Sequence, residues 1–298
     1  MTDRARAEEA PGIDVVLVAF RCRELLRRCL RSLQEHRSAA PMSVFVVDND
    51  SADGTLEMLA AEFPQALVFD QRRNSGFAAA TNVGIRAGSS PYVLVLNPDT
   101  ELTAGALDSL LELMERRTDI GMCGCRLELE DGSLDHAARR SFPTVLGALG
   151  HFTGLGRRGS APKALAQYRA PDVESGPVDA INGAFMLIRR GALAEVGLFD
   201  EGYWMYMEDL DLCYRFAQAG WRVWYDPSVA VRHVKGGTTG RRRTVKLDYA
   251  FHYGMLRFYR KFYARNRSAL VNAVVYAGIA TKLGTSVLRG ALAGVAGR

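Results

Sequence analysis

The stretch Tyr92-Val-Leu-Val-Leu-Asn-Pro-Asp99-Thr100 is an apolar run that stops at a proline and a carboxylate. Its apolar part is rich in β-branched residues, which indicates a strand buried on both faces of a mainly parallel sheet. Pro98 cannot donate to a sheet ladder, so the strand should end there and leave Asp99 on a loop. Because the carboxyl ends of strands line the ligand crevice of an open α/β sheet, Asp99 is a candidate ligand for a divalent cation, and the cation would suit a diphosphate.

Strand and helix patterns alternate on both sides of this run. We expect strands at 13–20, 43–47, 66–69, 92–97, 121–129, 184–188 and 221–225, and helices at 22–36, 54–62, 77–87, 102–116 and 207–219. Helices between successive strands predict βαβ units, and therefore an α/β fold with a parallel sheet. The stretch 130–177 breaks the pattern with several Gly, Pro and Arg residues, and we expect a long excursion that belongs to an acceptor site or a lid.

Length and composition limit the class of protein. The chain has 298 residues, of which 48% are hydrophobic, enough for one large α/β domain with additions. Residues 1–12 are charged and rich in alanine, which predicts a disordered tail and not a signal peptide. The five cysteines are odd in number and lack C-x-x-C spacing, which argues against disulfides and a zinc site and favours a reducing cytoplasm.

Charge is distributed unevenly along the chain. Residues 232–267 hold 11 Lys or Arg and one acid, whereas the remainder holds 27 basic and 32 acidic residues. A basic C-terminal end suggests a polyanionic partner, such as phospholipid head groups, a lipid diphosphate or nucleic acid. Residues 249–263 mix aromatic and basic side chains, and 269–280 is apolar but too short to cross a bilayer. We therefore expect residues 247–298 to form amphipathic helices on a membrane surface, or alternatively a dimer contact or a packed hairpin.

Two other segments place polar residues after predicted strands. Asp48 follows one strand and could accept a hydrogen bond from the N3–H of uracil or thymine, although its neighbours Asp50, Ser51 and Asp53 also suit a simple turn and helix cap. Residues 73–84 combine a polar loop with a helix of small residues, which by itself indicates close packing more often than ligand binding.

Near the start of a later helix, Glu208 and Asp211 share a face and Asp209 points away, so one carboxylate can face the crevice while others complement the helix dipole.

The ordered set of these motifs resembles family 2 glycosyltransferases with a GT-A fold, and in particular the rhamnosyltransferase-like branch that acts on lipid-linked acceptors. The resemblance covers Asp14 to His233 and rests on VDNDSADGT, RNSGFAAATNVGI, LNPDT, NGAFMLIRR, FDEGYWMYMEDLDLCYR and the following Arg232-His233. It implies a Rossmann-like catalytic domain at 13–246, with a nucleotide-binding half at 13–100 and an acceptor half at 101–246. It also implies inverting transfer of a sugar from a nucleoside diphosphate with Mg²⁺ or Mn²⁺.

The resemblance also assigns roles to residues. Asp99 would be the metal-binding acid of a D-x-D-like element, in which Asn97 replaces the first acid, and His233 would complete the metal site. Asp209 would be the general base that takes the proton of the acceptor hydroxyl. The remaining candidates for substrate contacts are Asp48, Asn74, Gly76, Asn97, Trp204, Glu208 and Arg241.

The resemblance favours an enzyme of cell-wall biosynthesis over two other classes, and the resemblance alone suggests the sugar. The lead hypothesis is transfer of L-rhamnose from dTDP-L-rhamnose to a saccharide on a polyprenyl diphosphate, at the cytoplasmic face of the plasma membrane, by a peripheral protein that could form a homodimer. A galactofuranosyl- or N-acetylhexosaminyltransferase that uses a UDP-sugar is the alternative. A nucleotidyltransferase would need a Gly-rich phosphate loop after the first strand, where Val18-Ala-Phe-Arg-Cys-Arg stands instead. A non-catalytic protein that binds nucleic acid or lipid is the remote alternative, since the basic aromatic segment also suits RNA.

Overall fold

The computed structural model describes residues 11–143, 174–234 and 244–296, with side chains to residue 288. The first half alternates strictly: β1 (Ile13–Ala19), α1 (Arg23–Glu35), β2 (Met42–Asp48), α2 (Thr55–Glu62), β3 (Leu67–Asp70), α3 (Phe77–Ala87) and β4 (Tyr92–Leu96). The second half contains β5 (Thr100–Glu101), α4 (Ala106–Arg116), β6 (Ile120–Glu128), β7 (Arg139–Arg140), β8 (Gly176–Pro177), β9 (Ala180–Ile181), β10 (Phe185–Arg189), α7 (Arg190–Val196), α8 (Glu208–Gln218) and β11 (Arg222–His233). Most of the predicted tail, most of the excursion at 130–177, and Arg241 with its glycine-rich loop lie outside the described residues.

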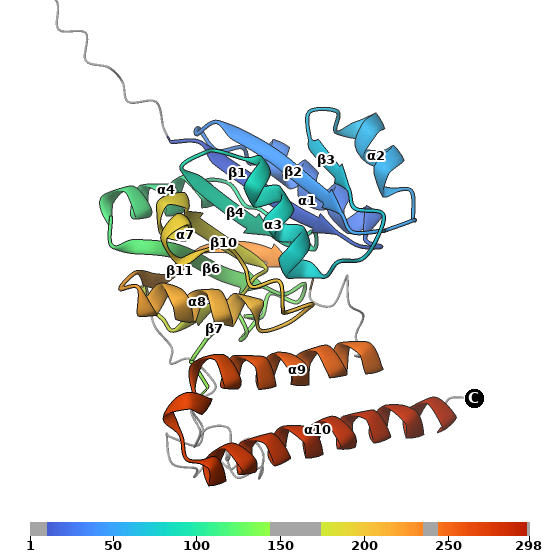
Figure 1. The fold of residues 1–298 in the computed structure, drawn as a ribbon. Coiled ribbons are helices and arrows are strands. Elements are labelled where there is room, and N and C mark those ends of the chain that lie inside the picture. Colours follow the sequence, from blue (N-terminus) through green and yellow to red (C-terminus); the bar gives the residue numbers. More distant parts are fainter. Residues whose placement is uncertain (1–10, 144–173, 235–243, 297–298) are drawn as a thin grey trace, which may run out of the picture.

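One mixed sheet forms the centre of the molecule, with the order β3-β2-β1-β4-β10-β6-β11-β5 (Figure 1). β1 is parallel to both β2 and β4, and β2 is parallel to β3. β10 is antiparallel to β4 and to β6, and β11 is parallel to β6. β6 and β11 therefore run in the same direction as the first four strands, and the sheet is mostly parallel, as the sequence predicts.

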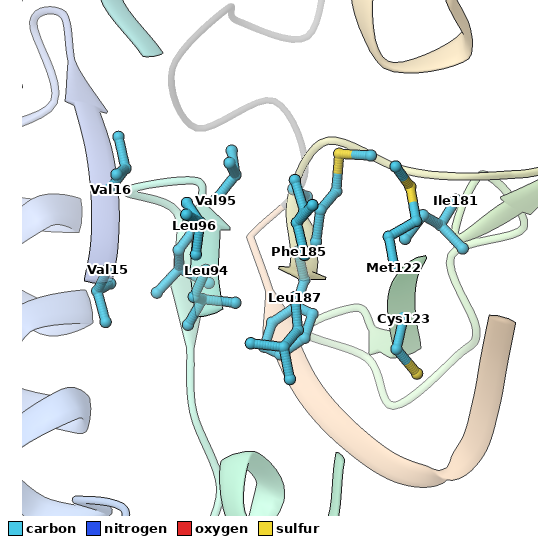
Figure 2. Close-up of a cluster of buried hydrophobic side chains, with 14 of the residues drawn as sticks. Val15, Val16, Leu94, Val95, Leu96, Met122, Cys123, Ile181, Phe185 and Leu187 are labelled. Carbon is cyan, nitrogen blue, oxygen red and sulfur yellow. The ribbon is translucent and has the colours of Figure 1, made fainter. Parts of the chain in front are cut away.

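The core explains why the central strands are apolar throughout. Every residue of β1 and β4 is buried, because helices cover both faces of the sheet. Figure 2 shows Val15 and Val16 of β1 beside Leu94 to Leu96 of β4, followed by Phe185 and Leu187 of β10. All five cysteines are buried free thiols.

Two long helices follow the sheet and lie to one side of it (Figure 1). α9 (Val245–Phe262) lies between the sheet domain and α10 (Ala269–Ala296), and a short 3₁₀ turn, Ala264–Asn266, joins them. The predicted apolar helix at 269–280 is much longer than expected, because its helical structure continues through Lys282. Within the described residues, only Ala269–Leu288 is long and apolar enough to cross a membrane, judged by length and composition alone, and 11% of it is buried.

Other differences from the predicted elements are local. α7 was not predicted, because it has only seven residues and follows β10 directly. A segment of this length is too short for its helical periodicity to be distinguished from the pattern of the strand. β11 continues to His233 and not to residue 225, since a register shift between Asp226 and Ala230 carries it past Pro227. This extension matters for the site, because it brings His233 opposite Thr100 of β5.

Candidate active site

The sheet directs the predicted site residues toward one edge. Asp48 ends β2, Asp99 follows β4, and His233 ends β11, and these three strands run in the same direction. β10 runs the opposite way, so its first residues lie at that edge too. The Asn97 amide donates to the Ala184 carbonyl over 2.9 Å, which joins the two strand ends directly. The arrangement is that of a ligand crevice in an open α/β sheet.

Asp99 and His233 are neighbours at this edge, although they are far apart in sequence. His233 Nε2 lies 3.5 Å from Asp99 Oδ1, and both side chains are buried. The other ring nitrogen of His233, Nδ1, lies 3.3 Å from Oδ2 of Asp135. Burial lowers the pKa of His233, but the nearby carboxylates of Asp135 and Asp99 outweigh that effect and raise the pKa to about 9. Asp135 thus orients the imidazole, as a carboxylate does behind many metal-binding histidines.

The donor set is small for a metal centre built by protein alone. Among the described residues no group of three or more His, Cys, Asp or Glu side chains is arranged to hold a metal ion. Asp99 Oδ1 is a buried carboxylate oxygen without a hydrogen-bond partner among those residues, and it faces His233 Nε2. The pair fits two ligands of a Mg²⁺ or Mn²⁺ ion whose other ligands come from substrate oxygens and water.

Asp48 lies at the end of β2 with one oxygen available. Its Oδ2 accepts the Ser51 amide over 3.2 Å, whereas Oδ1 is buried and has no hydrogen-bond partner among the described residues. Burial raises its pKa more than the Ser51 hydrogen bonds lower it. A buried acceptor without a partner is costly, which suits a carboxylate that meets a ligand donor. The turn role expected for Asp53 is also present, since its Oδ1 accepts the Thr55 amide.

A cavity of about 290 Å³ opens beside this strand end. It is bounded by the end of β1, the loop after β2, the start of α3 and the start of α9; its lining includes Phe20, Asn49, Asn74, Phe77, Trp204 and Lys246. The Lys246 ammonium lies 3.8 Å from the centroid of the Trp204 ring, a cation–π contact. The cavity therefore offers aromatic surfaces and one cation next to Asp48.

Asn74 and Gly76 fix the conformation of the loop that closes this cavity. Asn74 Oδ1 accepts hydrogen bonds from Asn49 Nδ2 over 3.2 Å and from the Gly76 amide over 3.1 Å. Gly76 has φ +89°, and a Cβ there would lie 2.4 Å from the Trp204 carbonyl oxygen. The next amide, that of Phe77, donates to that same oxygen over 2.8 Å. Gly76 is therefore required for the close approach of α3 to the Trp204 loop.

The first turn of α8 carries the predicted general base. Asp209 Oδ2 accepts the Gly183 amide over 3.1 Å and Arg140 Nη2 over 2.5 Å. Gly183 lies just before β10, so these hydrogen bonds place Asp209 beside the loop that carries Asp99. Arg140 belongs to β7 and also donates to the Ile181 carbonyl over 3.1 Å.

The neighbouring carboxylates of α8 have different surroundings. Asp211 is fully buried and points toward α9, where its Oδ2 accepts Lys261 Nζ over 2.7 Å and the Tyr203 hydroxyl over 3.1 Å. These contacts tie Asp211 to α9 and to the loop before α8, and they differ from the contacts of Asp209 with Gly183 and Arg140. Glu208 is buried, and its Oε2 has no hydrogen-bond partner within the described part of the chain. Burial, followed by the charge of Asp209, raises the pKa of Glu208 to about 8.

Sequence reasoning missed two contributors to this edge. Arg140 contacts Asp209, and Asp135 contacts His233, yet both come from the stretch after β6 whose regular pattern is lost. A single Arg or Asp in an irregular segment carries no periodic signal. Only the antiparallel pairing of β7 with β9 brings Arg140 to the site.

The chain is similar in sequence to known glycosyltransferases. The sequence profile described as "Glycosyl transferase family 2" matches residues 14–197. An N-acetylglucosaminyl-diphospho-decaprenol L-rhamnosyltransferase of Mycobacterium tuberculosis is 34% identical over 241 residues, which cover 77% of this chain and 78% of that protein. The rhamnosyltransferase WbbL of Escherichia coli is 26% identical over 68% of this chain and 78% of its own length.

Solved structures show the same fold at low identity. GalNAc-T7, with UDP, GalNAc and Mn²⁺, superposes with a TM-score of 0.62 at 17% identity, over 85% of this chain and 48% of that one. The mannosyltransferase PcManGT of Pyrobaculum calidifontis, with GDP-Man and Mn²⁺, gives a TM-score of 0.58 at 18% identity, over 98% of this chain and 77% of that one. The chain belongs to glycosyltransferase family 2 and has the GT-A fold.

Proposed function

We propose that this enzyme transfers L-rhamnose, with inversion, from dTDP-L-rhamnose to a saccharide carried on a polyprenyl diphosphate. The sugar and acceptor classes follow the Mycobacterium tuberculosis relative, which is named for both. The observation that carries the proposal is the placement of Asp209 on the Gly183 amide, at the same sheet edge as the Asp99–His233 pair. A base stands there next to the place where a diphosphate and its cation would lie.

Each residue then has a defined task. Asp48 Oδ1 accepts the N3–H of thymine, and the cavity lined by Phe20 and Trp204 holds the nucleoside. Asp99 and His233 would hold the divalent ion together with the donor diphosphate. When bound, this ion supplies charge neutralisation to the nucleoside diphosphate that leaves. Asn97, two residues before Asp99, contributes a neutral oxygen and not a second carboxylate.

The transfer needs one proton acceptor. Asp209 takes the proton of the acceptor hydroxyl while that oxygen bonds to the anomeric carbon and the bond from this carbon to the diphosphate oxygen breaks. Attack from the face opposite the leaving group inverts the anomeric configuration. Burial and the charge of Asp209 raise the pKa of Glu208 to about 8, so its protonated carboxyl is available at neutral pH to donate a hydrogen bond to a substrate oxygen. Arg140 holds the Asp209 carboxylate in position through its hydrogen bond.

The acceptor implies a membrane surface. The exposed apolar residues of α10, Leu270, Val274 and Leu288, favour peripheral attachment of the C-terminal helices at the cytoplasmic face of the plasma membrane. In this arrangement 13–246 is the catalytic domain and 247–298 is the attachment region, as the sequence predicts. A homodimer contact through the same helices is the competing role for this surface.

A thermal-shift panel tests the donor site directly. Wild type and Asp99→Asn are heated with dTDP, UDP, GDP and CDP, each with and without Mn²⁺ or Mg²⁺. We expect a metal-dependent rise in Tm with dTDP that Asp99→Asn loses. A rise with UDP alone would instead favour the galactofuranosyl- or N-acetylhexosaminyltransferase alternative. No rise with any nucleotide would contradict the proposed donor site.

A further inference from the structure

A second cavity lies away from the sheet edge, between the two C-terminal helices. Its volume is about 470 Å³, and its lining is mostly apolar and aromatic: Tyr249, Tyr253 and Leu256 from α9, and Tyr276, Ile279 and Leu283 from α10. Tyr249 and Tyr253 stack on one another with ring centroids 6.1 Å apart and stay 57% and 40% exposed. None of the roles assigned so far uses this cavity, which we call the hairpin groove.

The helices around the hairpin groove carry an excess of positive charge. Residues 244–288 contain seven Lys or Arg and a single acid, Asp248. Arg257 and Lys261 are neutralised by Asp200 and Asp211. By contrast, Arg260 lines the groove and is exposed, and within the described part of the chain it has no carboxylate partner. An apolar groove with a cation at its rim matches a molecule that has a long hydrocarbon part and an anionic head.

α9 connects this groove to the catalytic helix. On one side α9 forms the groove, and on its other side Gly254 packs so closely on the loop before α8 that a Cβ would lie 3.0 Å from the Tyr206 carbonyl oxygen. Phe251 meets the Tyr206 ring edge-on, with centroids 5.9 Å apart, and Lys261 reaches Asp211 of α8. The groove is therefore separated from the Asp209 helix by the width of a single helix, about 10 Å.

We propose that the hairpin groove binds the isoprenoid chain of the lipid-linked acceptor, with Arg260 near its anionic head. The proposal rests on the proposed function, because it concerns the acceptor of the same reaction. A chain held along α9 brings the sugar at its other end toward Asp209, and its methylenes leave water as they bind. Acceptors with long isoprenoid chains then bind more tightly than acceptors with short ones, and the preference resides in the groove.

Two acceptors that differ only in the chain test this idea. They are N-acetylglucosaminyl diphosphate esterified with a geranylgeranyl or an ethyl group, both used below the concentration at which they aggregate, with dTDP-L-rhamnose as donor. Ala280→Trp fills the groove, since Ala280 lines it. Ala277→Trp is the matched control, because it adds the same ring at an exposed position of α10 outside the lining. Tyr253→Ser, at a 40% exposed position, removes a wall of the groove without burying a new group.

We expect wild type to prefer the geranylgeranyl acceptor at least about ten-fold in kcat/KM, through KM, because that ratio corresponds to only about 1.4 kcal/mol of chain burial. Ala280→Trp and Tyr253→Ser should reduce this preference to about three-fold or less, whereas Ala277→Trp should keep it. Equal use of both acceptors by wild type would overturn the groove proposal and leave the transferase standing. An equal loss in Ala277→Trp would also overturn it, since the effect would then belong to the whole surface of α10. Failure of wild type to use either acceptor would instead count against the proposed function.

Discussion

Arg140 Nη2 lies 2.5 Å from Asp209 Oδ2, so that a cation from β7 contacts the carboxylate at the start of α8. The side chains are 15% and 10% exposed, so water screens this ion pair only weakly. The contact joins the irregular segment after β6 to the helix that carries the base. It gives Arg140 a positioning role that no motif in the sequence indicates.

Replacement of Arg140 should therefore affect turnover more than binding. We expect Arg140→Met to lower kcat about 10- to 100-fold, because the carboxylate loses the donor that orients it, while the KM for the nucleotide sugar changes little. Arg140→Lys should recover part of the loss, since a charged donor is kept. Steady-state kinetics on the three proteins separate the effects. A rise in donor KM with unchanged kcat would show that Arg140 binds substrate and does not position Asp209.

Glu208 gives a prediction about pH. Its pKa is raised to about 8, first by burial and then by the charge of Asp209, so the carboxyl group is protonated at pH 7. Because glutamine resembles the protonated form, Glu208→Gln should keep activity at pH 7 within about three-fold of wild type. As pH rises through about 8, wild type should lose activity while Glu208→Gln does not. Rate profiles from pH 6 to 9.5 measure this, and an inactive Glu208→Gln at pH 7 would mean that the ionised form is required.

Gly76 gives a prediction about stability and packing. A Cβ at Gly76 would overlap the Trp204 carbonyl oxygen, and φ is +89°. Gly76→Ala should reduce the free energy of unfolding by about 2–4 kcal/mol, from backbone strain together with overpacking. Gly105 is the control, since it has φ +72° but nothing within 4 Å of the added Cβ. Gly105→Ala should reduce the free energy of unfolding by only about 1 kcal/mol. Equal reductions for Gly76→Ala and Gly105→Ala in urea unfolding would contradict the close packing of Gly76 on Trp204.

Asp200 links α9 to the loop before α8 in a way that depends on pH. Burial raises its pKa, but hydrogen bonds from Arg257, Lys261 and the Gly202 amide outweigh burial and lower the pKa to about 2. The pKa of Asp200 is lower in the folded protein than in the unfolded chain, where it is about 4, so the ionised carboxylate stabilises the fold. This stabilisation is complete above about pH 4 and is lost as the pH falls toward 2. After allowance for solvent screening, Asp200→Asn should cost about 1–2 kcal/mol at pH 7. The difference in the free energy of unfolding between wild type and Asp200→Asn, measured by urea unfolding, should become smaller from pH 5 to pH 3. A difference that stays constant would exclude the ion pairs of Asp200 as its cause.

The fold was predictable from sequence where one physical signal acts alone. Apolar runs such as that of β4 give buried strands, and Pro98 ends this strand before Asp99, as the structure has it. The positions of Asp48 and Asp99 at one edge follow from parallel strands alone, whereas His233 reaches that edge through the unpredicted extension of β11. The antiparallel direction of β10 was not predictable, because the residues of a buried strand do not indicate which strands it pairs with or in which direction it runs.

The candidate site was predictable only in part, for a related reason. Glu208, Asp209 and Asp211 lie side by side in sequence, and only helix geometry and the contacts of each, with Lys261 for Asp211 and Arg140 for Asp209, separate their roles. Asn74 and Gly76 are held in place by contacts with Asn49 and Trp204, and Asn74 also lines the cavity beside the end of β2. Such contacts between distant segments arise from tertiary packing, which local patterns do not encode.

The assignment of Asp209 as the base is the central claim, and Asp209→Asn tests it most directly. Asparagine keeps the size of the side chain and an oxygen for the Gly183 amide, but it cannot take a proton. Single-turnover transfer from dTDP-L-rhamnose should fall by at least about 10³-fold, as expected for loss of a general base, while the Mn²⁺-dependent thermal shift with dTDP stays unchanged. An Asp209→Asn enzyme that transfers the sugar within ten-fold of the wild-type rate would contradict the account.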